Sequence, residues 1–145
     1  MKTFVALATV TLAAALGPAA MSSASADRGT VAAGSSRFGR ILYDGRGFVL
    51  YAFTKDPRRR SACSGACAAA WPPYLVTKAP KAGVGVKPSL LGSIRRANGT
   101  MQVTYAGRPL YYYIGDRVPR QILCQNVSEF GGLWLVARPN GTLVR

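Results

Sequence analysis

The chain has 145 residues, no His, and a formal net charge of +14 from 19 Lys and Arg against 5 Asp and Glu. Without His, a Ser-His-Asp or Cys-His catalytic arrangement, imidazole-ligated zinc and His-ligated haem are all excluded within this chain. So large a positive charge attracts polyanions such as acidic wall polymers and anionic lipid head groups. The alternative is a solvated basic surface without a specific partner.

The first 26 residues have the three parts of a secretory signal peptide. Lys2 gives a positive start, residues 4–16 form an apolar run, and residues 24–26 are an Ala-Ser-Ala cleavage site. The apolar run is too short to span a bilayer as a stable helix. We therefore expect an exported mature chain that begins at Asp27. No Cys lies near the cleavage site, so lipid attachment there is not expected.

The mature chain is expected to begin with a flexible lead-in over residues 27–38, which are mostly small and polar. A first hairpin follows, with a strand at 40–43, a turn at 44–47 and a return strand at 48–53. Both faces of the return strand are apolar, which predicts a central strand that is covered on both sides.

A short helix is predicted over residues 63–70, with Ser61 as its N-cap and Pro72 at its end. The Pro- and Gly-containing stretch 77–87 is predicted to be a connecting loop. These elements complete a first repeat of about residues 39–76.

A second repeat, at about residues 94–137, follows the same plan. Its Asn98-Gly99 turn between alternating runs is the strongest short hairpin signal in the chain. The elements predicted for this half are strands at 94–96 and 100–105, a turn at 106–108, a return strand at 109–114, and a closing hairpin of 133–137, 139–141 and 142–144.

Two copies of one motif, Tyr-x-aromatic-x-x-Asp, lie 60 positions apart. Their residues are Tyr51, Phe53 and Asp56 in the first copy and Tyr111, Tyr113 and Asp116 in the second. A repeat at a fixed period indicates one supersecondary unit used twice. We predict a mainly β fold with a short helix, in which two similar β-hairpin repeats pack into one small domain over residues 39–145.

The motif residues have a structural and a functional interpretation. Aromatic side chains on strands are first of all core material, although Tyr112 could belong to an exposed platform for a flat ligand. Asp56 and Asp116 at the strand ends are expected to bind turn amides. The sharper alternative brings the two carboxylates together to share a proton or a cation, as in a hydrolase-type enzyme.

Three cysteines in an exported chain predict one disulfide and one remaining thiol. Cys63 and Cys67 can pair locally, or one of them can pair with Cys124 and join the two halves. The functional alternative is an extracytoplasmic redox or metal-handling protein that uses these thiols, together with the thioether of Met101.

The densest basic clusters are Arg58, Arg59 and Arg60, and Arg95 and Arg96. Neither cluster is interleaved with aromatic residues, and no helix-turn-helix or zinc-finger pattern accompanies them. We therefore expect these arginines to bind an anionic polymer or lipid surface, and we expect no sequence-specific nucleic-acid binding.

Both motif copies resemble the bacterial secreted-repeat proteins of unknown function, also called predicted lipoproteins with a Tyr-x-(Phe/Trp/Tyr)-x-x-Asp motif. The Cys63 to Cys67 loop followed by Trp71-Pro72-Pro73, the run 102–111 and Gly131-Gly132-Leu133-Trp134 are also similar to this family. The resemblance covers about residues 39–145. It implies an envelope or secreted protein and favours Cys63 with Cys67 as the disulfide. It implies no reaction.

The chain departs from the family pattern in two ways. It lacks the lipidated Cys of many relatives, which implies release rather than anchoring, and it has Cys124 where a glycine-rich loop is common. The leading hypothesis is an exported, non-enzymatic binding or structural module without a cofactor, whose basic surface contacts an anionic envelope polymer.

Overall fold

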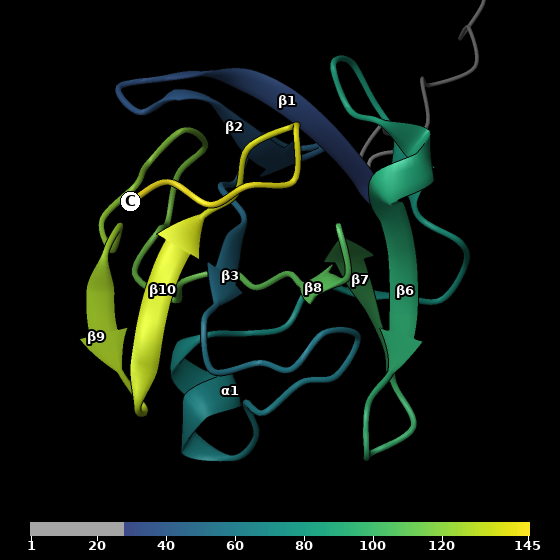
Figure 1. The fold of residues 1–145 in the computed structure, drawn as a ribbon, viewed down its shortest axis with the longest axis vertical. Helices are drawn as coiled ribbons and strands as arrows, with labels where there is room; N and C mark the ends of the chain where they lie inside the picture. Colours follow the sequence, from purple (N-terminus) through teal and green to yellow (C-terminus); the bar gives the residue numbers. More distant parts are fainter. Residues whose placement is uncertain (1–27) are drawn as a thin grey trace, which may run out of the picture.

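The computed structural model describes residues 28–145, which form a mainly β fold with one short α-helix (Figure 1). The elements in chain order are β1 Thr30–Ser36, β2 Gly39–Asp44, β3 Tyr51–Phe53, α1 Ala66–Ala70, β4 Leu75–Val76, β5 Lys81–Ala82, the 3-10 helix η2 Pro88–Leu90, β6 Leu91–Arg95, β7 Met101–Tyr105, β8 Arg108–Pro109, β9 Val127–Glu129 and β10 Gly132–Val136. The predicted fold class is confirmed. The predicted signal peptide, residues 1–26, and Asp27 lie outside the described residues.

An antiparallel hairpin opens each half of the molecule. β1 pairs with β2, and β6 pairs with β7. The second hairpin turns at Asn98 and Gly99 as predicted, and Gly99 has a φ of 86°, a left-handed conformation that glycine adopts without steric cost. In Figure 1 the β1–β2 hairpin lies at the top and the β6–β7 hairpin at the right, with β3 near the centre.

The strands form three small sheets, and two of these combine strands from both repeats. Their orders are β2-β1-β5, β3-β10-β9 and β4-β7-β6, with β8 also paired to β7. β10 from the second repeat pairs with β3 from the first, and β4 from the first repeat pairs with β7 from the second. Each half therefore completes a sheet of the other half.

The two repeats are related by an approximate twofold axis, which lies between the two motif tyrosines. The amides of Tyr51 and Tyr111 each donate to the other's carbonyl oxygen at 2.9 Å. Equivalent bonds flank this pair, because the Leu42 amide donates to the Ala137 carbonyl and the Val103 amide donates to the Tyr74 carbonyl, both at 2.9 Å. The duplication seen in the sequence is therefore also present in the hydrogen bonding.

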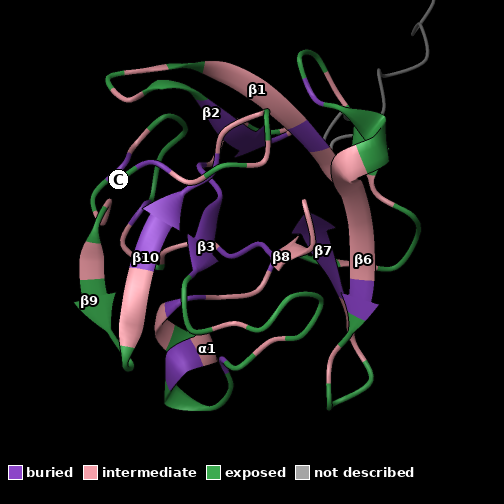
Figure 2. Cartoon of the chain, in the orientation of Figure 1, coloured by how far each residue is buried: buried purple, intermediate pink, exposed green. Residues whose placement is uncertain are grey.

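The return strand of the first hairpin is covered on both sides, as predicted. Val49, Tyr51 and Phe53 belong to one buried cluster, and Leu50 belongs to a second. The alternation follows from the period of two along a strand. Figure 2 shows β3 as buried, whereas exposed residues lie in the loops, at strand ends and on part of α1. The predicted return strand is regular only over Tyr51–Phe53.

The first cluster is built on aromatic rings that repeat across the twofold axis. Trp71 and Trp134 stack with ring centroids 4.0 Å apart. Tyr51 meets Trp71 edge-on at 5.2 Å, and Tyr111 meets Trp134 edge-on at 5.1 Å. Buried aromatic pairs of this kind add about 0.5–1.5 kcal/mol each beyond the area that they bury. One aromatic core is therefore shared by both repeats.

The expected flexible lead-in is wrong for most of its length. Residues Thr30–Ser36 form β1, which pairs with β2 over six residue pairs from Val31 with Asp44 to Ser36 with Gly39. The predicted loop 77–87 contributes β5, which pairs in parallel with the start of β1. Since residues 32–36 of β1 are Ala, Gly and Ser, which have little strand preference of their own, these pairings decide the structure of that part.

The short helix is present, but its predicted cap is wrong. α1 begins at Ala66, and Gly65 is the N-cap residue, without a side-chain capping bond. Ser61 lies too far upstream to cap it and instead contacts the Tyr111 hydroxyl at 2.8 Å. No helix within residues 28–145 is long and apolar enough to cross a membrane.

The predicted return strand 109–114 is regular only at its start, in β8, and we expect the segment that follows to be held by the burial of Leu110. The side chain of Leu110 is fully buried, whereas Ile114, four positions on, is 60% exposed. Leu110→Ala should lower the free energy of unfolding by about 2–5 kcal/mol, because it removes buried methyl groups and leaves a cavity. Ile114→Ala should change it by no more than about 0.5 kcal/mol. Urea unfolding of both variants measures this, and equal losses would contradict the assigned burial.

Candidate functional site

The two motif copies complete each other through their polar ends. The Tyr51 hydroxyl donates to Asp116 Oδ2 at 2.7 Å, and the Tyr111 hydroxyl donates to Asp56 Oδ2 at 2.7 Å. Both tyrosines are buried, and a buried phenol requires a hydrogen-bond partner. Each repeat therefore supplies the acceptor for the tyrosine of the other repeat.

The two aspartates also hold the loops that follow their strands. Asp56 Oδ1 accepts the Ala62 amide at 2.7 Å, and Asp116 Oδ1 accepts the Leu123 amide at 3.0 Å. Amide partners were expected from the sequence, but the tyrosine partners were not. Among residues 28–145 no hydrogen bond joins the two carboxylates, which are each occupied by one phenol and one amide.

Burial raises the pKa of the two aspartates and of the two tyrosines that they accept from. Loss of solvation raises the pKa of Asp56 and of Asp116 above the ordinary value, and the hydrogen bonds that they accept offset this only in part. Burial, followed by the nearby carboxylate, raises the pKa of Tyr51 and of Tyr111 far above the ordinary value. The phenols therefore stay protonated at neutral pH and act as donors.

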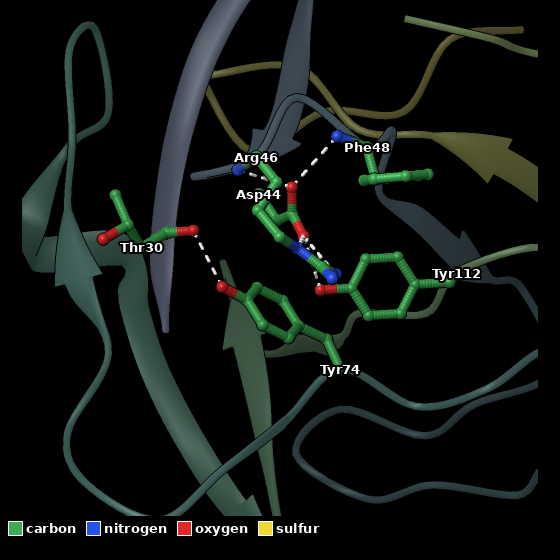
Figure 3. Close-up of polar contacts among 6 residues, drawn as sticks. All are labelled: Thr30, Asp44, Arg46, Phe48, Tyr74 and Tyr112. Carbon is green, nitrogen blue, oxygen red and sulfur yellow. Dashed lines mark hydrogen bonds and ion pairs between the residues drawn. The ribbon is translucent and has the colours of Figure 1, made fainter. Parts of the chain in front are cut away.

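A third aspartate, Asp44, organises a separate buried cluster that Figure 3 shows. Its Oδ1 accepts the Arg46 and Phe48 amides, both at 2.9 Å, which closes the turn after β2. Its Oδ2 accepts the Arg46 guanidinium at 2.9 and 2.8 Å and the Tyr112 hydroxyl at 3.0 Å. Sequence reasoning placed Asp44 in a turn and missed this wider role.

Tyr112, the candidate for an exposed aromatic platform, belongs to this internal cluster. Its ring lies 5.2 Å from that of Tyr74, whose hydroxyl donates to the Thr30 carbonyl of β1 at 2.8 Å (Figure 3). Burial raises the pKa of Tyr74 to about 12. The pair therefore anchors β1 to the second buried cluster, and the platform interpretation has no support in this geometry.

The cysteines form one local disulfide and one thiol. Cys63 and Cys67 are joined, and Cys124 is free, half-buried and packed against the aromatic cluster. A loop this short is worth about 2 kcal/mol in the chain-entropy model. Burial raises the pKa of the Cys124 thiol. Within residues 28–145 no group of three or more Cys, Asp and Glu side chains is placed to hold a metal ion.

Comparison with protein families gives two matches to a single family model, described as a secreted repeat of unknown function, at residues 34–74 and 92–138. The chain belongs to this family. The membership inferred from the motifs is confirmed, and so is the presence of two copies. No curated protein and no solved structure matches the chain.

Each copy of the secreted repeat contains one motif tyrosine and one core tryptophan. The first matched range includes Tyr51 and Trp71, and the second includes Tyr111 and Trp134. The two ranges therefore coincide with the halves that exchange hydrogen bonds and share the aromatic core. The family pattern describes the scaffold of the molecule.

One predicted anion-binding residue of this secreted repeat is turned inward. The Arg96 guanidinium donates to Gln102 Oε1 and the Cys63 carbonyl, both at 2.7 Å, and to Ser61 Oγ at 2.9 Å. Its Nε is buried without a partner in the described residues. Arg96 therefore braces the cysteine loop against β7 and differs in this from its exposed neighbour Arg95.

The other basic cluster lies on the surface. Arg58, Arg59 and Arg60 are exposed in the loop between Asp56 and the disulfide. The Arg59 amide donates to the Gly107 carbonyl at 2.7 Å, and the Arg58 guanidinium lies beside Gly107. The loop is therefore held against the turn that leads into Arg108 of the second repeat.

The raised pKa of Asp116 predicts a specific dependence of stability on pH. A carboxyl with a raised folded-state pKa contributes fully below its ordinary value of 3.8, and this contribution is lost as pH rises through the folded-state pKa. Asp116→Asn should therefore lose less stability than the native protein between about pH 3.5 and about pH 7. Tyr51→Phe should lose more, because it removes a donor that favours the ionised carboxyl.

Urea unfolding of the three proteins at both pH values measures this difference. The two substitutions affect the same hydrogen bond from opposite sides, so each serves as the control for the other. If both variants lose more stability than the native protein between the two pH values, or if both lose less, the hydrogen bond does not set the pH dependence.

Proposed function

We propose that this secreted repeat is an exported, non-enzymatic binding module whose basic surface contacts an anionic polymer of the cell envelope. The observation that carries the proposal is an asymmetry between the two kinds of charge. Each of the four acidic side chains of the described residues accepts hydrogen bonds from other groups of the protein, whereas most of the basic side chains are exposed and without an acidic partner.

The acidic side chains are few and occupied. Lys2 and Asp27 lie outside the described residues, so residues 28–145 hold 18 of the 19 basic residues and four of the five acidic ones. Three of the four are the aspartates described above. The fourth, Glu129, accepts the Trp71 indole N–H at 2.8 Å. Local neutralisation of the surface by carboxylates is therefore slight.

The basic side chains of residues 28–145 are numerous, and all but one are free of ion pairs. Among residues 28–145 the one ion pair is Arg46 with Asp44, at 2.8 Å. The exposed basic residues are Arg28, Arg37, Arg40, Arg46, Lys55, Arg58, Arg59, Arg60, Lys78, Lys81, Lys87, Arg95, Arg117, Arg120 and Arg145. A surface of this kind raises the local concentration of polyanions and speeds their association.

The loop of Arg58, Arg59 and Arg60 is the best candidate for the centre of the contact. Its backbone is fixed at Arg59 by Gly107 and at Ala62 by Asp56, so its three charges lie on an ordered loop. An ordered loop loses less conformational entropy on binding than a flexible one. The nearby Asp56 carboxylate is already bound to Tyr111.

Neutralising this loop should weaken binding to a defined anionic polymer. We expect the Arg58→Gln, Arg59→Gln, Arg60→Gln variant to bind immobilised polyglutamate about tenfold more weakly, because three exposed contacts of about 0.5 kcal/mol each sum to about 1.5 kcal/mol. Binding isotherms over a series of salt concentrations measure the loss, which should be greatest at low salt.

The matched control removes the same charge elsewhere. Lys55→Gln, Lys87→Gln, Arg117→Gln replaces three exposed residues that lie in different segments. It should retain most of the native affinity. Equal weakening in both variants would show that only net charge matters, and an absence of native binding would overturn the polymer proposal.

We also infer that the mature protein is released rather than lipid-anchored. Its cysteines are at positions 63, 67 and 124, far from the predicted cleavage site. Two of them form the disulfide, and the third packs against the aromatic core. These contacts support a structural use of all three sulfur atoms.

The intact mass of the exported protein provides the test. We expect the mass of an unmodified chain that begins at Asp27, less two hydrogens for the disulfide. A larger mass that falls after alkaline removal of ester-linked acyl groups would contradict release. Native protein that is expressed without residues 1–26 is the reference.

A further inference from the structure

A groove of about 850 Å³ is lined by residues other than those of the arginine loop. Its walls come from three segments: Arg28 just before β1, the stretch from β4 to the first residue of β5, and the turn between β6 and β7 with the first residue of β7. This volume lies within the roughly 300–1,000 Å³ range of sites for small ligands. None of its lining residues belongs to the motif pair, the disulfide or the Arg58–60 loop.

The floor of the groove is apolar and accessible to solvent. β4 and β7 pair there, with Val76 opposite Met101. Val76 and Met101 are half-buried and project from the same face of the ladder, whereas Leu75 pairs with Gln102 and projects from the other face. The exposed parts of Val76 and Met101 offer a surface on which an alkyl chain can displace water.

The rim of the groove is cationic. Arg28, Lys78 and Lys81 line it, all three are exposed, and none forms an ion pair within residues 28–145. No acidic residue is among the lining residues that the structure describes. A simple anion would leave the apolar floor unused, and a neutral lipid would leave the cations without a partner.

We propose that this groove binds an anionic amphiphile, a carboxylate or phosphate monoester that carries an alkyl chain. The head group contacts Arg28, Lys78 and Lys81, and the chain lies on Val76 and Met101. The site is separate from the polymer surface and does not depend on the proposed function. A free fatty acid and the head and chain of an anionic lipid share this chemistry.

Titration calorimetry with sodium decanoate below its micelle concentration tests the proposal on the exported protein. We expect saturable binding at one site. Acetate, which has the head group without the chain, and octyl glucoside, which has a chain without the charge, should each bind at least tenfold more weakly. A dihexanoyl phosphatidate probe then asks whether a lipid occupies the same site, through competition with decanoate.

Two charge-matched variants separate the groove from the overall charge. Lys78→Glu, Lys81→Glu should weaken decanoate binding at least tenfold, whereas Lys55→Glu, Lys87→Glu should stay within about twofold of the native protein. Both pairs are exposed, so neither should disturb the fold, which circular dichroism checks. Met101→Asn should weaken decanoate binding but leave acetate binding unchanged.

Several results would overturn the proposal. These are an absence of saturable decanoate binding, acetate binding as tight as decanoate binding, and equal losses in the two double variants. Polyglutamate binding is measured on the same proteins. Loss of decanoate binding with retained polyglutamate binding in Lys78→Glu, Lys81→Glu is the expected result, and it keeps the two proposals distinguishable.

Discussion

The reciprocal bond between a tyrosine of one repeat and an aspartate of the other is the constraint on which the structure depends. Tyr51 and Tyr111 lie side by side at the centre, and their backbones already bond to each other. Their buried hydroxyls still need acceptors, and an unsatisfied buried hydroxyl costs about 1–3 kcal/mol. Since Asp116 and Asp56 supply those acceptors across the axis, each repeat is completed by its partner.

Local patterns in the sequence were sufficient for much of the fold but not for its pairings. The Asn98-Gly99 turn and the alternation along residues 49–53 act within a few residues, and both were predicted correctly. The acceptor of Tyr51 is 65 residues away and is decided by the topology. β1 was missed for the same reason, because its strand conformation comes from pairing with β2 and β5.

The basic surface follows first from composition, because residues 28–145 hold 18 basic residues and four acidic ones. The structure adds where those four carboxylates lie. Asp44, Asp56 and Asp116 accept hydrogen bonds from tyrosines, and Glu129 accepts from Trp71. Composition alone would not have shown that the three aspartates lie beside tyrosines of the core.

The features that differ between the repeats are the ones that point to function. After Asp56 the loop carries three consecutive exposed arginines and the disulfide. After Asp116 it carries two separate exposed arginines, Arg117 and Arg120, and the exposed side chains of Val118 and Leu123 before Cys124. Both loops are tied by the same aspartate-to-amide bond, so the scaffold tolerates either content. The duplicated motif therefore holds the shared core, and the sequences of the two loops can differ without disturbing it.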